Sequence, residues 1–244
     1  QSKRNQLKTS FTVLNISFIS EPKLKFLTYE RLNFIFSGRI FSPSAHLLPP
    51  AGVRHCQVLE RHVRGCSQHR VRHLQHPPAA GTALTMSLLN EMLKNPNVVA
   101  VKNSSMPTQD IQMFKDAGIA ARGEGNFVVF NGPDEQFVSG RVIGADGGIG
   151  GTYAVMPELY LAMNDHINKG EIKEAQAIQY DADRIIYKMC EAHGNLYAVQ
   201  KEILRRMYGL ELGGVREPMP SLIPEDEPIV AEAQAMIEAA IAKL

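Results

Sequence analysis

Asn97-Val-Val-Ala-Val-Lys102-Asn-Ser-Ser105 places a lysine at the end of a short, continuous apolar run. Such a run is typical of a parallel strand that is buried on both faces. Two glycine-rich strand ends follow, Phe130-Asn-Gly-Pro-Asp-Glu135 and Gly144-Ala-Asp-Gly-Gly-Ile-Gly-Gly-Thr-Tyr153, and each precedes a predicted helix. This arrangement predicts a lysine at the mouth of a parallel β/α barrel, where the active sites of such barrels lie.

Strand and helix alternate along this part of the chain. The predicted strands cover 98–101, 127–130 and 147–153, and the helices around them cover 84–93, 107–117, 134–143 and 157–168. We expect Gly118 and Gly170 to end two of these helices, because glycine is favoured just after a helix. The alternation predicts a parallel α/β sheet. Further helices are predicted over 171–192, 197–208 and 229–241.

The charge of the chain changes sign near Ala80. Residues 1–79 hold twelve Lys and Arg against three Glu and no Asp, a net charge of +9. Residues 80–244 hold fourteen Lys and Arg against twenty-two acidic residues, a net charge of −8. Such a break indicates two domains, a basic arm that binds nucleic acid, or sequence that did not evolve as one unit.

Composition also bears on the compartment. The chain has no apolar run of about eighteen residues, so we expect no membrane span. Its three cysteines are widely spaced, which favours a reducing cytoplasmic location over a disulfide scaffold.

Lys102 is the first candidate for chemistry. Partial desolvation at the end of a buried strand lowers the pKa of a lysine, and the neutral amine can attack a ketone to form an imine. The protonated imine is an electron sink that allows the neighbouring C–C bond to break or form. The alternative is a strand-end lysine that only reaches solvent, and position alone favours that alternative.

Polar and glycine residues near the other two strand ends have two possible roles. Asp134 and Glu135 begin a helix, where they either complement the helix dipole or accept hydrogen bonds from a polyhydroxylated ligand. The glycines within 147–151 allow close backbone approach, either of a ligand or of neighbouring strands.

The order of these segments resembles that of the N-acetylneuraminate lyase / dihydrodipicolinate synthase superfamily of class I aldolase barrels, over about residues 80–244. Asn131-Gly-Pro-Asp-Glu135 and the segment from Gly144 to Tyr153 are more similar to the sialic-acid lyase branch than to the synthase branch. The resemblance implies an α/β fold, the C-terminal part of a TIM (β/α)8 barrel with its last three strands, followed by C-terminal helices.

The resemblance also implies roles for individual residues. Lys102 would be the catalytic Schiff-base lysine. The expected substrate-binding residues are Ser104, Gly132, Asp134, Glu135 and Gly151. The lyases commonly carry serine at the position of Gly151. No metal and no cofactor are implied, the expected partner is a small 2-oxo acid or sialic acid, and the family is commonly a homotetramer.

The upstream half of such a barrel is missing from residues 1–79. The resemblance requires a loop that binds the pyruvoyl carboxylate and a Tyr-Asn-Ile-Pro motif whose tyrosine moves protons. Leu74-Gln75-His76-Pro77 stands where that motif belongs. These residues can be encoded CTA-CAA-CAT-CCC, which encodes Tyr-Asn-Ile-Pro when read one base later. We therefore predict that residues from about 46 to 79 are out of frame, and that residues 1–79 form an unassigned, poorly ordered basic segment.

Two rival interpretations of this segment are a metal module and a nucleic-acid arm. Its zinc-ligand residue types are His55, Cys56, His62, Cys66, His69 and His73. There is no Cys-x2-Cys pair, however, and the two cysteines stand ten residues apart. The arginines lack a recognisable nucleic-acid motif or interleaved aromatic residues. We therefore expect neither a metal nor a nucleic-acid partner.

Together these features predict a Schiff-base-forming, pyruvate-dependent aldolase, a carbon–carbon lyase. The favoured reaction is cleavage of N-acetylneuraminate to N-acetylmannosamine and pyruvate. Within the family the alternative is 4-hydroxy-tetrahydrodipicolinate (dihydrodipicolinate) synthase or another pyruvate aldolase. Outside enzymes, the alternative is a non-catalytic barrel fragment that acts as an interaction partner. We expect the chain as written to be a poor enzyme, because Leu74 replaces the proton-moving tyrosine.

Overall fold

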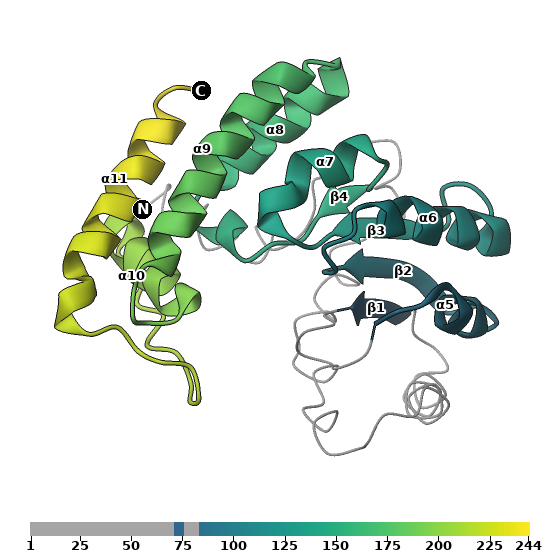
Figure 1. Cartoon of the computed structure of the whole chain (residues 1–244), viewed down its shortest axis with the longest axis horizontal. Coiled ribbons are helices and arrows are strands. Elements are labelled where there is room, and N and C mark those ends of the chain that lie inside the picture. Colours follow the sequence, from purple (N-terminus) through teal and green to yellow (C-terminus); the bar gives the residue numbers. More distant parts are fainter. Residues whose placement is uncertain (1–70, 76–82) are drawn as a thin grey trace, which may run out of the picture. The chain divides into compact units, whose positions relative to one another are not determined.

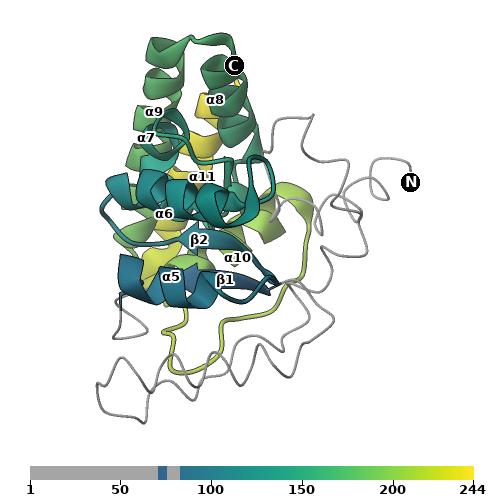
Figure 2. The ribbon, with the colours of Figure 1, turned by 90° about the vertical axis from the view of Figure 1, so that its right-hand side faces the viewer.

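A computed structural model describes residues 71–75 and 83–244 of the chain (Figure 1 and Figure 2). These residues belong to two compact units. The described residues up to Ile149 make a sheet unit, and Gly150–Leu244 make a helical unit. Most of residues 1–79 falls outside the described ranges, so the predictions of an out-of-frame segment, of its poor order and of a domain boundary at Ala80 stay predictions.

The sheet unit contains four parallel strands in the order β1-β2-β3-β4. The strands are β1 (Val71–Gln75), β2 (Val98–Asn103), β3 (Val128–Asn131) and β4 (Gly147–Gly148). Parallel neighbours require a crossover between each pair. The crossovers contain α5 (Met86–Leu93), α6 (Gln109–Arg122), and η3 (Asp134–Gln136) with α7 (Phe137–Val142). The predicted α/β class is therefore confirmed.

One apolar layer lies between β2, β3 and the helices α5 and α6. Val101 and Val129 are register partners on adjacent strands and both are fully buried. They belong to one cluster with Leu89 from α5 and with Ile111 and Phe114 from α6. Each such side chain contributes about 1.5–3 kcal/mol to folding when it is removed from water. This layer holds the two central strands in a defined register.

Gly118 does not end α6, contrary to the prediction. The helix continues to Arg122 and ends at Gly123, whose φ is 86°. A methyl group at position 118 would lie 2.0 Å from the ring of Phe127. The glycine therefore allows the helix to pack closely against the residue that precedes β3, and it is not a helix terminator.

The predicted strand over 147–153 is shorter than expected. Only Gly147 and Gly148 pair with β3, opposite Phe130 and Asn131. Because β3 itself ends at Asn131, β4 has no partner beyond that level among the strands that the structure describes. Residues Thr152–Ala154 instead form the 3-10 turn η4, which begins the helical unit.

The helical unit follows the predicted pattern closely. It contains α8 (Pro157–Lys169), α9 (Ile172–Cys190), α10 (Leu196–Tyr208), η5 (Pro224–Asp226) and α11 (Glu227–Ile241). Helix α9 packs against α8, α10 and α11. Gly170 ends α8 with a φ of 80°, as predicted, because a left-handed residue closes the last helical turn.

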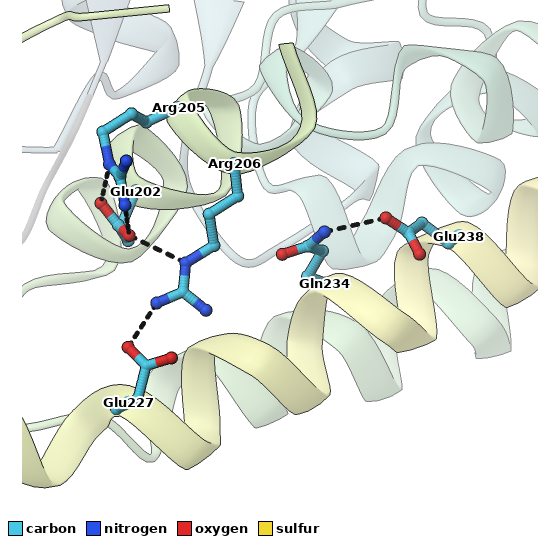
Figure 3. A network of polar contacts seen from close by, with 6 residues as sticks. All are labelled: Glu202, Arg205, Arg206, Glu227, Gln234 and Glu238. Carbon is cyan, nitrogen blue, oxygen red and sulfur yellow. Dashed lines mark hydrogen bonds and ion pairs between the residues drawn. The ribbon is translucent and has the colours of Figure 1, made fainter. Parts of the chain in front are cut away.

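A network of charged side chains joins α10 to α11. Glu202 accepts hydrogen bonds from Arg205 at 2.6 Å and from Arg206 at 2.8 Å, and Arg206 also bonds Glu227 (Figure 3). The hydrogen bond from Arg205 is the main cause that lowers the pKa of Glu202 to about 2. The carboxylate is therefore ionised at neutral pH, and the network links the end of α10 to the first turn of α11.

The sheet begins earlier in the sequence than we expected. Val71–Gln75 forms β1 beside β2, so a fourth strand adds to the three that were predicted.

Of the helices that the structure describes, none is long and apolar enough to cross a membrane.

Candidate active site

The carboxyl ends of β2 and β3 carry the residues that the sequence singled out. Lys102 is the register partner of Phe130, and Asn103 is the partner of Asn131. Successive residues of a strand point to opposite faces of the sheet. Because the preceding residue, Val101, packs into the helix-facing layer, Lys102 projects from the opposite face.

The surroundings of Lys102 favour its neutral amine. Burial lowers the pKa of Lys102 below its ordinary value, whereas the negative charge of Asp134 acts in the opposite direction and raises it. Burial is the larger effect. A larger fraction of the amine is therefore unprotonated near neutral pH than in an exposed lysine. The unprotonated amine is the form that attacks a carbonyl carbon.

Ser104 and Gly132 lie against each other at the two strand ends. A methyl group at position 132 would be 2.4 Å from the carbonyl oxygen of Asn103 and 2.4 Å from Oγ of Ser104. No side chain fits there without a shift of the backbone. Gly132 therefore allows the turn after β3 to approach the turn after β2, which brings these two predicted residues together.

Asp134 and Glu135 differ in their environment although they are neighbours in η3. Asp134 is buried, with 9% of its surface exposed, and its charge acts on Lys102. Glu135 is exposed. The structure thus brings Asp134 into the surroundings of the lysine, and the role of Glu135 as a substrate contact stays a prediction.

The turn after Lys102 is held by a polar network that the sequence analysis did not identify. Oδ1 of Asn103 accepts hydrogen bonds from the backbone N–H of Ser105 at 3.1 Å and from its hydroxyl at 2.6 Å. The hydroxyl of Ser105 also lies 3.1 Å from Oδ2 of Asp110 in α6. The order Asn-x-Ser is a recognisable signal for such a turn, because asparagine commonly bonds the backbone two residues ahead.

Asn131 plays a similar part after β3. Its side chain is fully buried and donates a hydrogen bond of 2.7 Å to the carbonyl oxygen of Pro133. A methyl group on Gly140 of α7 would lie 2.3 Å from Oδ1 of Asn131. Asn131 therefore fixes the turn that carries Gly132 and Asp134.

Gly151 belongs to the helical unit, where it precedes η4. A methyl group at this position would lie 3.1 Å from Cε1 of Tyr197 and 3.5 Å from its hydroxyl oxygen. The ring of Tyr197, from α10, therefore occupies the space beside Gly151. The role of Gly151 as a substrate contact stays a prediction.

No metal centre accompanies these residues in the part of the chain that the structure covers. Among the described residues, no group of three or more His, Cys, Asp or Glu side chains is placed to hold a metal ion. The charge of Asp134 acts on the amine of Lys102, and Ser104 and Gly132 meet at the ends of the same two strands. A buried amine of this kind can form an imine with a small carbonyl compound.

Relatives of known name share this part of the chain. The chain is 62% identical over 161 residues to the N-acetylneuraminate lyase of Mediterraneibacter gnavus. The matched stretch covers 66% of this chain and 50% of the relative. Identity to the N-acetylneuraminate lyase of Rhizobium meliloti is 31% over 160 residues, with coverages of 66% and 50%. The chain spans about half the length of the curated relatives it matches.

Solved structures of a sialic acid aldolase are also similar to this chain. The wild-type sialic acid aldolase of Ruminococcus gnavus is 52% identical with a TM-score of 0.75, covering 80% of this chain and 64% of that one. A catalytic lysine mutant of that aldolase has a TM-score of 0.76 at the same identity, covering 80% and 63%. The sequence profile of the Dihydrodipicolinate synthetase family matches residues 74–239. Since this match spans more than half of the residues, the chain belongs to the Dihydrodipicolinate synthetase family.

Proposed function

We propose that this chain carries the imine-forming part of a pyruvate-dependent class I aldolase. The proposal rests on Lys102, which lies at the carboxyl end of a parallel strand near the charge of Asp134. Burial lowers the pKa of this lysine. Relatives that match this part of the chain are an N-acetylneuraminate lyase and a sialic acid aldolase, and one of the similar solved structures is a catalytic lysine mutant of that aldolase.

The proposed chemistry begins at the amine. Nζ of Lys102 adds to the ketone carbon of a 2-oxo acid, and the adduct takes up a proton and loses water to give a protonated imine. When the neighbouring C–C bond breaks, its electron pair moves toward the imine nitrogen, and a proton leaves the hydroxyl of the departing carbon. The products are an aldehyde and an enamine. Protonation and hydrolysis of the enamine then release the 2-oxo acid and restore the amine.

The proposed substrate is N-acetylneuraminate, cleaved to N-acetylmannosamine and pyruvate. The identity of 62% to a named N-acetylneuraminate lyase supports this choice, and so does the segment Asn131-Gly-Pro-Asp-Glu135. Ser104, Gly132, Glu135 and Gly151 are the proposed further contacts. Synthesis of dihydrodipicolinate is the alternative. Pyruvate release from N-acetylneuraminate, compared with condensation of pyruvate with aspartate semialdehyde, distinguishes the two reactions.

We further propose that the sheet unit is a C-terminal portion of a (β/α)8 barrel. Four parallel strands with helical crossovers support this architecture. Leu74 is the register partner of Lys102, and the family resemblance assigns this position to the proton-moving tyrosine. A leucine carries no proton, so we propose that proton transfer is impaired. A cytoplasmic location and a homotetrameric assembly are proposed from the family resemblance alone.

Trapping of the imine tests the proposal directly. With pyruvate and borohydride, the full-length chain should gain a covalent adduct on Lys102 alone, located by peptide mass spectrometry. Lys102→Arg should abolish the adduct, whereas Lys169→Arg, at an exposed lysine that ends α8, should leave it unchanged. Labelling spread over several lysines would contradict a preorganised site.

A further inference from the structure

Two buried asparagine side chains end the neighbouring strands β2 and β3. Asn103 and Asn131 are register partners, and they are 1% and 0% exposed. Val101 and Val129, two residues earlier on each strand, pack into the helix-facing layer. Side chains two residues apart on a strand point to the same face, so both carboxamides lie on that face, opposite Lys102. Adjacent strands are about 4.8 Å apart, which makes the two carboxamides neighbours.

The backbone partners of these side chains fix which end of each carboxamide is oxygen. The N–H of Ser105 can only donate, so the atom of Asn103 that lies 3.1 Å from it is Oδ1. The carbonyl oxygen of Pro133 can only accept, so the atom of Asn131 that lies 2.7 Å from it is Nδ2. The remaining atoms are therefore a donor, Nδ2 of Asn103, and an acceptor, Oδ1 of Asn131.

These two remaining atoms complement each other. Both are buried, and neither makes a hydrogen bond with any residue that the structure describes. Buried polar atoms in proteins are nearly always bonded to protein or to ordered water. Because the two atoms make no direct bond, a link between them requires one intervening water, which accepts from Nδ2 of Asn103 and donates to Oδ1 of Asn131.

Each carboxamide also anchors one of the two turns at the candidate site. Oδ1 of Asn103 bonds the turn after β2 through the N–H and the hydroxyl of Ser105. Nδ2 of Asn131 bonds the turn after β3, which leads to Asp134 at the start of η3. Lys102 directly precedes Asn103 on β2. A link between the two carboxamides therefore joins the strand end that carries Lys102 to the turn that leads to Asp134.

We propose that Asn103 and Asn131 are positioning residues, joined through one buried water, that hold Lys102 and Asp134 at a fixed separation. Neither carboxamide contacts the substrate, because both lie on the opposite face of the sheet from Lys102. They act on the amine through the backbone of the two turns. The inference rests on the proposed imine-forming function, since it concerns the position of the amine that reacts.

A double-mutant cycle on the full-length chain tests this link. The rate constant of pyruvate adduct formation on Lys102 is measured at saturating pyruvate with borohydride present. Asn103→Ala and Asn131→Ala should each lower this rate constant about tenfold, because a small displacement of a reacting group is costly. Linked residues are not additive, so the double variant should lose clearly less than the roughly hundredfold expected of independent residues. The pyruvate concentration at half-saturation should stay unchanged, because neither side chain contacts pyruvate.

Asn126 provides the matched control. Its carboxamide also bonds a backbone carbonyl, that of Arg122 at 3.2 Å, but the residue is exposed and precedes β3. Asn126→Ala should leave the rate constant unchanged, and it should add nothing to the effect of Asn131→Ala. Misfolded protein lowers the final yield of adduct, whereas displacement of the amine lowers the rate constant of the folded protein. The two measurements therefore separate loss of folding from loss of positioning.

A crystal structure of the original chain checks the water itself. One ordered water should lie within about 3.2 Å of both Nδ2 of Asn103 and Oδ1 of Asn131. Its absence would overturn the link, and so would a double variant whose loss equals the product of the two single losses. Unchanged rate constants in both single variants would overturn the positioning role and leave imine formation at Lys102 intact. A chain that forms no adduct on Lys102 would instead overturn the proposed function, and this inference with it.

Discussion

At the scale of single residues, Gly118 gives a test in which two effects have opposite signs. In an unconstrained helix, Gly→Ala stabilises by about 0.5–1 kcal/mol because alanine loses less backbone entropy. At position 118, however, the new methyl group would lie 2.0 Å from the ring of Phe127. We expect Gly118→Ala to destabilise the chain by about 1–3 kcal/mol, the usual cost of overpacking.

Urea denaturation followed by circular dichroism measures this change. Ala120→Gly, at an exposed position of the same helix, is the control and should cost only the helix propensity of about 0.5–1 kcal/mol. Stabilisation by Gly118→Ala would show that α6 does not pack against Phe127 as described.

The charge of Asp134 predicts how imine formation at Lys102 depends on pH. Asp134 raises the pKa of Lys102, in opposition to the larger effect of burial. Replacement by asparagine removes that charge, so the pKa of Lys102 should fall further and the neutral amine should persist to lower pH. The pH profile of borohydride trapping with pyruvate should therefore shift to lower pH in Asp134→Asn.

Glu135→Gln is the matched control, because Glu135 is the neighbouring acid, is exposed, and is not among the charges that act on Lys102. Its trapping profile should coincide with that of the original chain. A shift to higher pH in Asp134→Asn would contradict the electrostatic coupling.

At the scale of elements, Asp226 joins the loop after α9 to the start of α11. Its carboxylate accepts hydrogen bonds from the backbone N–H groups of His193 at 2.7 Å, Gly194 at 3.1 Å and Ile223 at 3.0 Å. Burial by itself would raise the pKa of Asp226, but these hydrogen bonds outweigh it and lower the pKa to about 2. The carboxylate therefore stabilises the helical unit in its ionised form.

Replacement of Asp226 by asparagine should lower the Tm at neutral pH by a few degrees. Because the folded-state pKa lies below that of an unfolded aspartate, the stabilisation is complete above about pH 4 and is lost as the pH falls toward 2. The Tm difference between the two proteins should thus shrink over this interval. Thermal unfolding by circular dichroism at several pH values measures it, and a difference that grows toward pH 2 would refute this role.

The sequence predicted well those elements whose apolar pattern repeats over many residues. The stripes of α8 to α11 repeat over several turns, and the structure confirms these helices. Single residues were harder to interpret, because Gly118 could end a helix or allow close packing. The extent of β4 depends on where β3 ends, which is a property of the partner strand.

Only part of the candidate site could be predicted from the sequence. The predicted part comprises residues in contiguous motifs that follow apolar runs, and the structure brings them together at adjacent strand ends: Lys102, Ser104, Gly132 and Asp134. Asn103 and Asn131 were not identified, although their hydrogen bonds fix both turns. Short polar side chains that bond their own backbone leave no periodic trace in a sequence, and their partners emerge only from the folded turn.

At the scale of the whole molecule, we predict that imine formation and turnover separate. Imine formation requires the amine of Lys102 and its surroundings, which lie within the sheet unit. Bond cleavage also requires a group that moves the proton of the substrate hydroxyl. Leu74, the register partner of Lys102, stands where the family resemblance expects that group. Loss of a general acid or base typically lowers a rate about 100- to 10,000-fold.

The purified chain should therefore form the pyruvate adduct on Lys102 but release pyruvate from N-acetylneuraminate at least about 100-fold more slowly than an intact family member. A coupled pyruvate assay measures this release, and the Lys102→Arg variant sets the background. Since the adduct and the turnover are measured on the same preparation, misfolding would abolish both, whereas the lack of a group that accepts the hydroxyl proton lowers only the turnover. Turnover equal to that of an intact relative would show that another group of the chain moves the proton.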